Sequence, residues 1–214
     1  MTIHHRLIVV TVAAIATVTG LITYQLAREK LLTPEQLQAM GTVFFNTPRV
    51  FTMDNLISHH GKAFTHDNLK GKWTLAYFGY TFCPDICPTT LSQLNAVDKL
   101  LKSDNIAWAD TIQYVLFSID PERDTVEKLA QYVPYFNPDF IGVTGSIKAI
   151  HTLTRQLNIA FTPVVNNSDE FYLVDHSANL VIINPQGDYH GFIKPPFTRE
   201  KLKRILEEMV RSFY

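Results

Sequence analysis

The chain has 214 residues, enough for one domain of common size and an additional segment. Its 19 basic and 20 acidic residues give a formal net charge of −1, so it lacks the basic excess of a nucleic acid-binding protein. It contains two cysteines, which excludes a structural zinc site built from four cysteines.

The first predicted element is an apolar helix. Residues 7–27 carry no charged side chain, and a run of this length can cross a bilayer as a helix. A cleaved signal peptide is the alternative, with Ala14-Ile15-Ala16 as a small-residue cleavage site. The apolar run continues well past this site, which favours a retained anchor. We therefore predict a transmembrane anchor at residues 7–27.

A linker with a short helix is expected at residues 28–46, before a domain at residues 47–214. Thr33 would cap this helix and Gln36 would complete a capping box. Residues 50–53 and 63–65 then predict a β-hairpin in front of the domain core. The neighbouring histidines of its turn, His59 and His60, could bind a metal, but we interpret them and His66 as solvated.

The central stretch runs from Trp73 to Leu101. It begins with an apolar run that predicts a buried strand ending near Tyr80, and it ends in apolar residues at helical spacing: Leu91, Leu94, Val97 and Leu101. Between them lie Cys83 and Cys87. Pro84 is typical of the first position of a helix, so we expect Cys83 at or just before a helix start, where the helix dipole favours a thiolate.

The spacing of the two cysteines leaves two chemistries open. Residues four apart share a helix face, so Cys83 and Cys87 could form a disulfide after a small adjustment or hold one soft metal ion. The C-x-x-x-C pattern differs from the C-x-x-C of thioredoxins. Two inert buried cysteines are the structural alternative, which the two flanking prolines disfavour.

The second half of the chain alternates between strands and helices. Strands are expected at 114–119, 140–143, 171–175, 180–183 and 189–193, helices at 124–135, 146–157 and 197–214, and a loop at 161–170. This order predicts an α/β fold with a central mixed sheet. We interpret Asp120 and Arg123, which follow the second strand, mainly as structural, with a position facing the thiols as the alternative. His190 is interpreted as a surface residue.

Four segments resemble the Sco/SenC family of thioredoxin-fold copper proteins, over about residues 42–212. They are D-N-L-K-G-K-W at 67–73, Y-F-G-Y-T-F-C-P-D-I-C-P at 77–88, F-S-I-D-P-E-R-D-T at 117–125 and Y-L-V-D-H-S at 172–177, the last followed by V-I-I-N-P-Q-G-D-Y at 181–189. The resemblance implies a thioredoxin-like domain with an added N-terminal β-hairpin. It also implies a copper site formed by Cys83, Cys87 and His176, although a lone strand histidine is more often structural. Phe82 stands where many family members carry histidine.

The family resemblance implies a copper metallochaperone that assists assembly of the dinuclear copper centre of cytochrome c oxidase. Two thiolates favour Cu(I), and an added imidazole allows Cu(II). Asp175 could orient the site through hydrogen bonds. The implied partners are the copper-accepting oxidase subunit, an upstream copper donor and a thiol reductant. The implied location is the inner membrane, with a single pass and the domain facing the periplasm.

A thiol–disulfide oxidoreductase is the alternative from another class. Cys83 and Cys87 would then exchange with cysteines of the oxidase subunit or of other extracytoplasmic proteins. Because both functions use the same two thiols, the sequence leaves open whether the chain is an enzyme. A peroxidase is disfavoured, since no proline of a peroxiredoxin motif stands in the residues 79–82 that precede Cys83.

Overall fold

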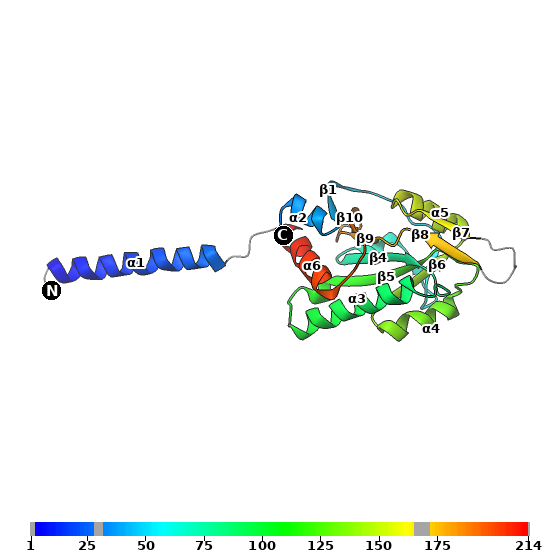
Figure 1. Ribbon diagram of the computed structural model, residues 1–214, viewed down its shortest axis with the longest axis horizontal. Helices are drawn as coiled ribbons and strands as arrows, with labels where there is room; N and C mark the ends of the chain where they lie inside the picture. Colours follow the sequence, from blue (N-terminus) through cyan, green and yellow to red (C-terminus); the bar gives the residue numbers. More distant parts are fainter. Residues whose placement is uncertain (1–2, 28–31, 165–171, 214) are drawn as a thin grey trace. The chain divides into compact units, whose positions relative to one another are not determined.

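The computed structural model describes residues 3–27, 32–164 and 172–213, which belong to two compact units divided after Leu32 (Figure 1). The first unit contains one helix, α1 (Ile3–Ala27), where the sequence predicts a helix. Within the described ranges, no helix combines the length and apolar character needed to span a membrane. The second unit is the domain that carries the cysteines.

An eight-stranded mixed sheet forms the centre of this domain, with strand order β1-β10-β9-β4-β5-β6-β2-β3. Every residue of β4 and of β5 is buried, because both strands lie inside the sheet and helices cover it. This burial explains the continuous apolar runs from which they were predicted. Five of these strands are β4 (Trp73–Gly79), β5 (Ile112–Ser118), β6 (Ile141–Gly145), β9 (Leu180–Ile183) and β10 (Tyr189–Ile193).

Helices follow the strands as the sequence predicts, and the α/β class is confirmed. Figure 1 shows α3 and α4 on one side of the sheet and α5 on the other. The hydroxyls of Thr125 and Ser146 accept the backbone N–H groups of Lys128 and Ala149, so α4 and α5 each begin at a capping side chain. The helices are α3 (Ile86–Ser103), α4 (Val126–Phe136), α5 (Ile147–Gln156) and α6 (Arg199–Phe213), with short 3-10 turns η1 (His66–Leu69) and η2 (Ala109–Thr111).

The added hairpin is present, but its first strand lies later than expected. It consists of β2 (Leu56–Ser58) and β3 (Ala63–Phe64), and β2 also pairs with β6. The prediction of a strand at residues 50–53 was wrong. Asn55 has a φ of 55°, and this left-handed turn directs the chain into β2.

The domain also begins earlier than expected. Helix α2 (Pro34–Ala39) has the predicted capping box of Thr33 and Gln36. Strand β1 (Thr42–Arg49) pairs with β10, with Thr42 opposite Ile193. The compact unit starts at Thr33, so the structure includes residues 33–46 of the expected linker in the domain.

A second, two-stranded sheet lies outside the main one. Strand β7 (Phe161–Val164) pairs antiparallel with β8 (Leu173–His176), and Phe161 lies opposite His176. The expected loop at 161–170 therefore begins as a strand, and its remainder from residue 165 lies outside the described residues. This pairing joins distant segments, which local composition does not reveal.

Candidate metal centre

The cysteines lie in the loop between β4 and α3 and at the start of that helix. Asp85 is the N-cap residue and α3 begins at Ile86, so Cys83 precedes the helix and Cys87 lies in its first turn. Cys83 therefore lies just before the helix start, as expected, although the helix begins two residues after Pro84. The Cys83 N–H bonds to the Tyr80 carbonyl in a turn, and Asp85 has non-helical backbone angles, which delay the helix.

Cys83 and Cys87 are free, buried thiols that interact with each other. The Cys87 backbone N–H donates to Cys83 Sγ at 3.4 Å. The first N–H groups of a helix have no partner within the helix, so they are free to bind a negatively charged group such as a thiolate. A hydrogen bond from the Cys87 thiol lowers the pKa of Cys83 to about 4, although burial acts in the opposite direction. The same hydrogen bond and burial raise the pKa of Cys87. The pair therefore consists of one thiolate and one thiol at neutral pH, with Cys83 as the thiolate.

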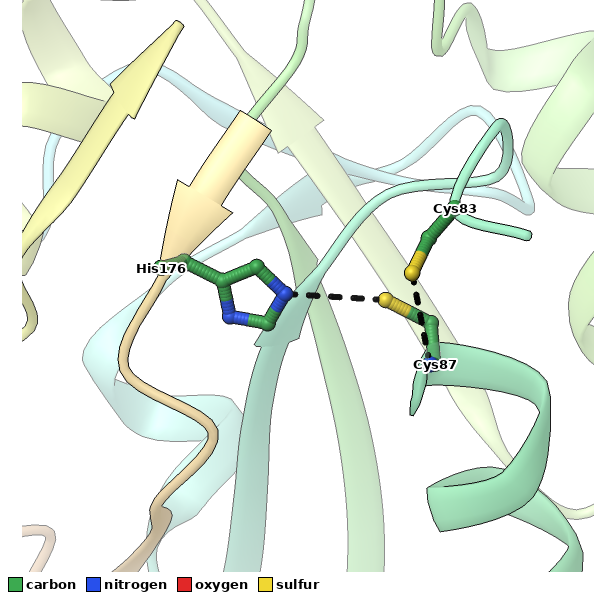
Figure 2. A group of neighbouring side chains, drawn as sticks. All are labelled: Cys83, Cys87 and His176. Atoms are coloured by element: carbon green, nitrogen blue, oxygen red, sulfur yellow. Dashed lines mark hydrogen bonds between the residues drawn. The ribbon is translucent and has the colours of Figure 1, made fainter. Parts of the chain in front are cut away.

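His176 reaches the cysteines from the end of β8. Its Nε2 lies 3.7 Å from Cys87 Sγ (Figure 2). Its Nδ1 lies 3.2 Å from the Ser177 carbonyl oxygen. A proton on Nδ1 would be donated to that carbonyl, leaving the Nε2 lone pair facing the sulfurs. This is the usual arrangement of a metal-binding histidine and its outer hydrogen-bond partner.

Together the three side chains form a candidate metal centre. Their ligand atoms all lie within 4.8 Å of one another, and they are the one such group of histidine, cysteine or carboxylate ligands found in the described part of the chain. Figure 2 shows Nε2 of His176 pointing towards the two sulfurs, which come from the loop and from the first turn of α3. Two sulfurs and one imidazole suit a soft metal ion such as copper.

Tyr77 is a contact of this centre that sequence reasoning missed. It is fully buried in β4, and its hydroxyl donates to Cys87 Sγ at 3.5 Å. Burial raises the pKa of Tyr77, so the phenol remains a neutral donor. A buried tyrosine hydroxyl needs a hydrogen-bond partner, which is the signal that could have identified it. Gly79 makes the close approach possible, because a Cβ there would lie 2.8 Å from the Tyr77 ring and 3.0 Å from Cys87 Sγ.

The remaining residues of the predicted site lie around it. Asp175 is exposed and pairs in register with Thr162, and its proposed orienting role stays a prediction. Asp120 and Arg123 are not in the ligand group; they bond to each other, and Arg123 also bonds to the Tyr172 carbonyl. Phe82 is exposed beside them, with the Arg123 guanidinium 4.9 Å from its ring centroid.

The other predicted histidines are not brought to the centre. The interpretation of His59 as solvated was wrong: it is buried, and its Nδ1 accepts the Gly142 N–H at 2.9 Å. Burial lowers the pKa of His59. His60 is exposed, and His66 packs its ring against Phe51. His190 is only partly exposed, with its ring centroid 5.1 Å from that of Trp73, so the surface interpretation was also wrong.

Comparison with known proteins places this geometry in a family. A family model described as SCO1/SenC matches residues 48–211. Protein sco1 of Schizosaccharomyces pombe is 33% identical over 196 residues, covering 90% of this chain and 73% of that protein. The structure of Arabidopsis thaliana ScoI with copper bound is 35% identical, with a TM-score of 0.66, and covers 77% of this chain and 98% of that one. Yeast Sco1 with copper bound is 28% identical, with a TM-score of 0.69, and covers 78% and 91%.

Proposed function

This chain belongs to the SCO1/SenC family of thioredoxin-like copper-binding proteins, and from that premise we propose that it is a copper metallochaperone. Its recipient would be the dinuclear copper centre of cytochrome c oxidase. The observation that carries the proposal is the convergence of Cys83 Sγ, Cys87 Sγ and His176 Nε2 within 4.8 Å of one another. Structures of relatives that hold copper support the choice of metal.

The protonation states of the two thiols suit binding of copper as cargo. Cys83 is already a thiolate and needs no proton removed, whereas Cys87 would release a proton when it binds the ion. The two sulfurs favour Cu(I), and the His176 imidazole adds a ligand suited to Cu(II). A disulfide between Cys83 and Cys87 would abolish binding, so loading requires a reduced site and a thiol reductant.

The surroundings of the site suit transfer by ligand exchange. A cleft beside it is lined by Tyr80, by residues 83–86 and by residues 173–176. Phe82, Ile86 and Leu173 expose apolar side chains near the cleft. A copper-accepting oxidase subunit could insert its own ligands there, and an upstream donor could use the same opening.

A thiol–disulfide oxidoreductase is the second candidate, favoured by the low pKa of Cys83. Its thiolate would attack a disulfide of the partner and form a mixed disulfide while one partner sulfur leaves as a thiolate. Cys87 would then attack Cys83, leaving a disulfide in this chain and a dithiol in the partner. Cys83 is 8% exposed and Cys87 is fully buried, so Cys83 would be the attacking residue.

The experiment that separates the two functions compares wild type with His176→Ala in the reduced state. Each is titrated with Cu(I) and with Cu(II) against a competing chelator, and each is assayed for reduction of a model protein disulfide. If the chain is a metallochaperone, wild type should bind one copper ion tightly and His176→Ala should lose most Cu(II) binding. His60→Ala, at an exposed histidine outside the centre, should bind as wild type does. Weak, equal copper binding with fast disulfide reduction would instead support the oxidoreductase.

We also propose that residues 7–27 anchor the chain in the inner membrane, with the domain in the periplasm. The absence of charged side chains from this segment supports the proposal. An alkaline wash of isolated membranes should leave the full chain in the pellet and release a variant that lacks residues 1–28. Release of the full chain by the wash would contradict anchoring.

A further inference from the structure

The strand that carries His176 lacks the backbone support that the cysteines have. Among the described strands, β8 pairs with β7 alone, in a sheet separate from the one that contains β4. Cys87, in contrast, is fully buried in the first turn of α3. The distance between the imidazole and the sulfurs therefore depends on side-chain contacts that join β8 to the body of the domain.

Two sets of contacts make this connection. The Val174 N–H donates to the Tyr80 hydroxyl at 3.1 Å, just before the cysteine loop. Further along, Arg123 Nη1 donates to the Tyr172 carbonyl at 3.0 Å, and the Tyr172 hydroxyl donates to Asp120 Oδ1 at 2.6 Å. The Arg123 guanidinium also lies 3.7 Å from the centroid of the Tyr172 ring and forms an ion pair with Asp120.

The same turn that supplies Asp120 and Arg123 also holds the cysteine loop. The buried Asp124 carboxylate accepts the Thr81 hydroxyl at 2.6 Å and the Thr81 N–H at 3.1 Å. It also accepts the Ser118 hydroxyl at 2.6 Å. Residues 118–124 thus bond on one side to the loop before Cys83 and on the other to the segment before His176.

We propose that Arg123 is a positioning residue that sets the distance between His176 and the two cysteines. The proposal rests on the proposed copper function, which it deepens. Arg123 holds Tyr172, four residues before His176, or about 13 Å away along an extended strand. With the β8 bond to Tyr80, this contact fixes the strand at two points before the imidazole. Arg123 touches none of the three proposed ligands and acts through the backbone of β8.

The geometry requires arginine rather than any cation. The guanidinium donates through Nε to the Asp120 carboxylate and through Nη1 to the Tyr172 carbonyl, while its plane lies over an aromatic ring. A lysine ammonium keeps the charge but lacks this planar fork. Arg123→Lys should therefore preserve much of the ion pair with Asp120 and lose the hydrogen bond to the Tyr172 carbonyl.

Variants must separate positioning from folding, because the pair is buried. The Asp120 side chain is 2% exposed and that of Arg123 is 17% exposed, so removing the arginine alone leaves a buried carboxylate without its partner. We would therefore use Arg123→Lys, and a double variant, Asp120→Asn with Arg123→Met, in which both charges are absent. Lys102→Met is the matched control, since Lys102 bridges Asp98 and Asp139 outside the centre.

The test measures Cu(II) and Cu(I) dissociation constants of the reduced full chain, with the Cu(II) electron paramagnetic resonance spectrum and the melting temperature. We expect both Arg123 variants to weaken Cu(II) binding by about 10-fold, the lower end of the loss caused by removing a direct partner of a ligand, because Arg123 acts on His176 through the strand. Their spectra should move towards that of His176→Ala, while Cu(I) binding changes less than about threefold. Lys102→Met should match wild type in both dissociation constants and in the spectrum, and should lower only the melting temperature, because the buried Asp98 loses its partner.

A copper-independent readout keeps this inference distinct from the proposed function. In the reduced apo protein, the backbone amides of residues 173–177 should show faster motion by nuclear magnetic resonance in Arg123→Lys than in wild type. Unchanged motion and an unchanged Cu(II) spectrum, even with a lower melting temperature, would overturn the positioning role. Wild type without histidine-dependent Cu(II) binding would instead refute the copper function, and the amide motion alone would then decide the role of Arg123.

Discussion

The sulfur half and the imidazole half of the candidate centre are supported in different ways. Cys83 and Cys87 follow a fully buried central strand and meet the first turn of α3, so backbone structure holds them. His176 lies half-buried at the end of a small separate sheet, which side chains from a distant turn connect to the domain. The sulfur half is therefore preformed, whereas the imidazole half can adjust. Substitution of either cysteine should then weaken the binding of both Cu(I) and Cu(II), whereas substitutions around β8 should weaken mainly the binding of Cu(II).

The largest expected effect is loss of the sulfur half. Cys83→Ser or Cys87→Ser should weaken Cu(I) binding by at least about 100-fold, because a hydroxyl is a poor ligand for a soft ion. Competition with a chromophoric Cu(I) chelator measures this loss. His176→Ala is the counterpart from the other half and should retain most Cu(I) affinity. Equal Cu(I) losses in all three variants would remove the distinction between the halves.

The pH dependence of Cys83 alkylation should show that the sulfur half is preorganised. The pKa of Cys83 is lowered to about 4, so its thiolate is present at all pH values well above this and is lost only as pH falls through it. A small alkylating reagent should react with the folded protein at a nearly constant rate from pH 6 to 8. In denaturant the rate should rise roughly 80-fold over this range, as expected for a thiol of pKa about 8.5. If the alkylation rate rose with pH equally in the folded and the denatured protein, the assignment of Cys83 as a thiolate would be wrong.

Gly79→Ala tests the packing behind the sulfurs. The added Cβ would lie 2.8 Å from the Tyr77 ring and 3.0 Å from Cys87 Sγ, so the ring or the sulfur must move. Such overpacking should lower the free energy of unfolding by about 1–3 kcal/mol, measured by denaturant titration. Gly20→Ala, where the Cβ meets nothing within 4 Å, should leave the unfolding of the domain unchanged. A stability loss of similar size in both variants would argue against this packing constraint.

Two tyrosines allow the smallest and most direct comparison of the halves. Tyr77→Phe removes the hydroxyl that donates to Cys87, and Tyr80→Phe removes the one that accepts the Val174 N–H. Each loss should cost about 1 kcal/mol of stability, the usual net value of one hydrogen bond. Tyr77→Phe should alter Cu(I) affinity, and Tyr80→Phe should alter Cu(II) affinity. If both variants changed the Cu(I) and Cu(II) affinities in the same way, the two halves of the centre would be coupled.

Local elements could be predicted from the sequence alone. The apolar runs identify β4 and β5, and the hydroxyls at positions 125 and 146 mark two helix starts, because burial and capping depend on neighbouring residues. The four-residue spacing of the cysteines also predicts their proximity. The helix start after Cys83 was predicted too early, since the turn formed by the Cys83 N–H and the Tyr80 carbonyl was not foreseen.

The long-range parts were decided by the tertiary structure. His176 meets Cys87 across 89 positions, and without the family resemblance its residue type and neighbours did not favour a ligand. The β7–β8 pair, the bond between Tyr77 and Cys87, and the Arg123 contact with Tyr172 likewise join segments that local periodicity treats separately. Sequence patterns report which side of an element is buried, but they do not specify which distant group lies against it. For this protein, that choice brings the imidazole to the sulfurs.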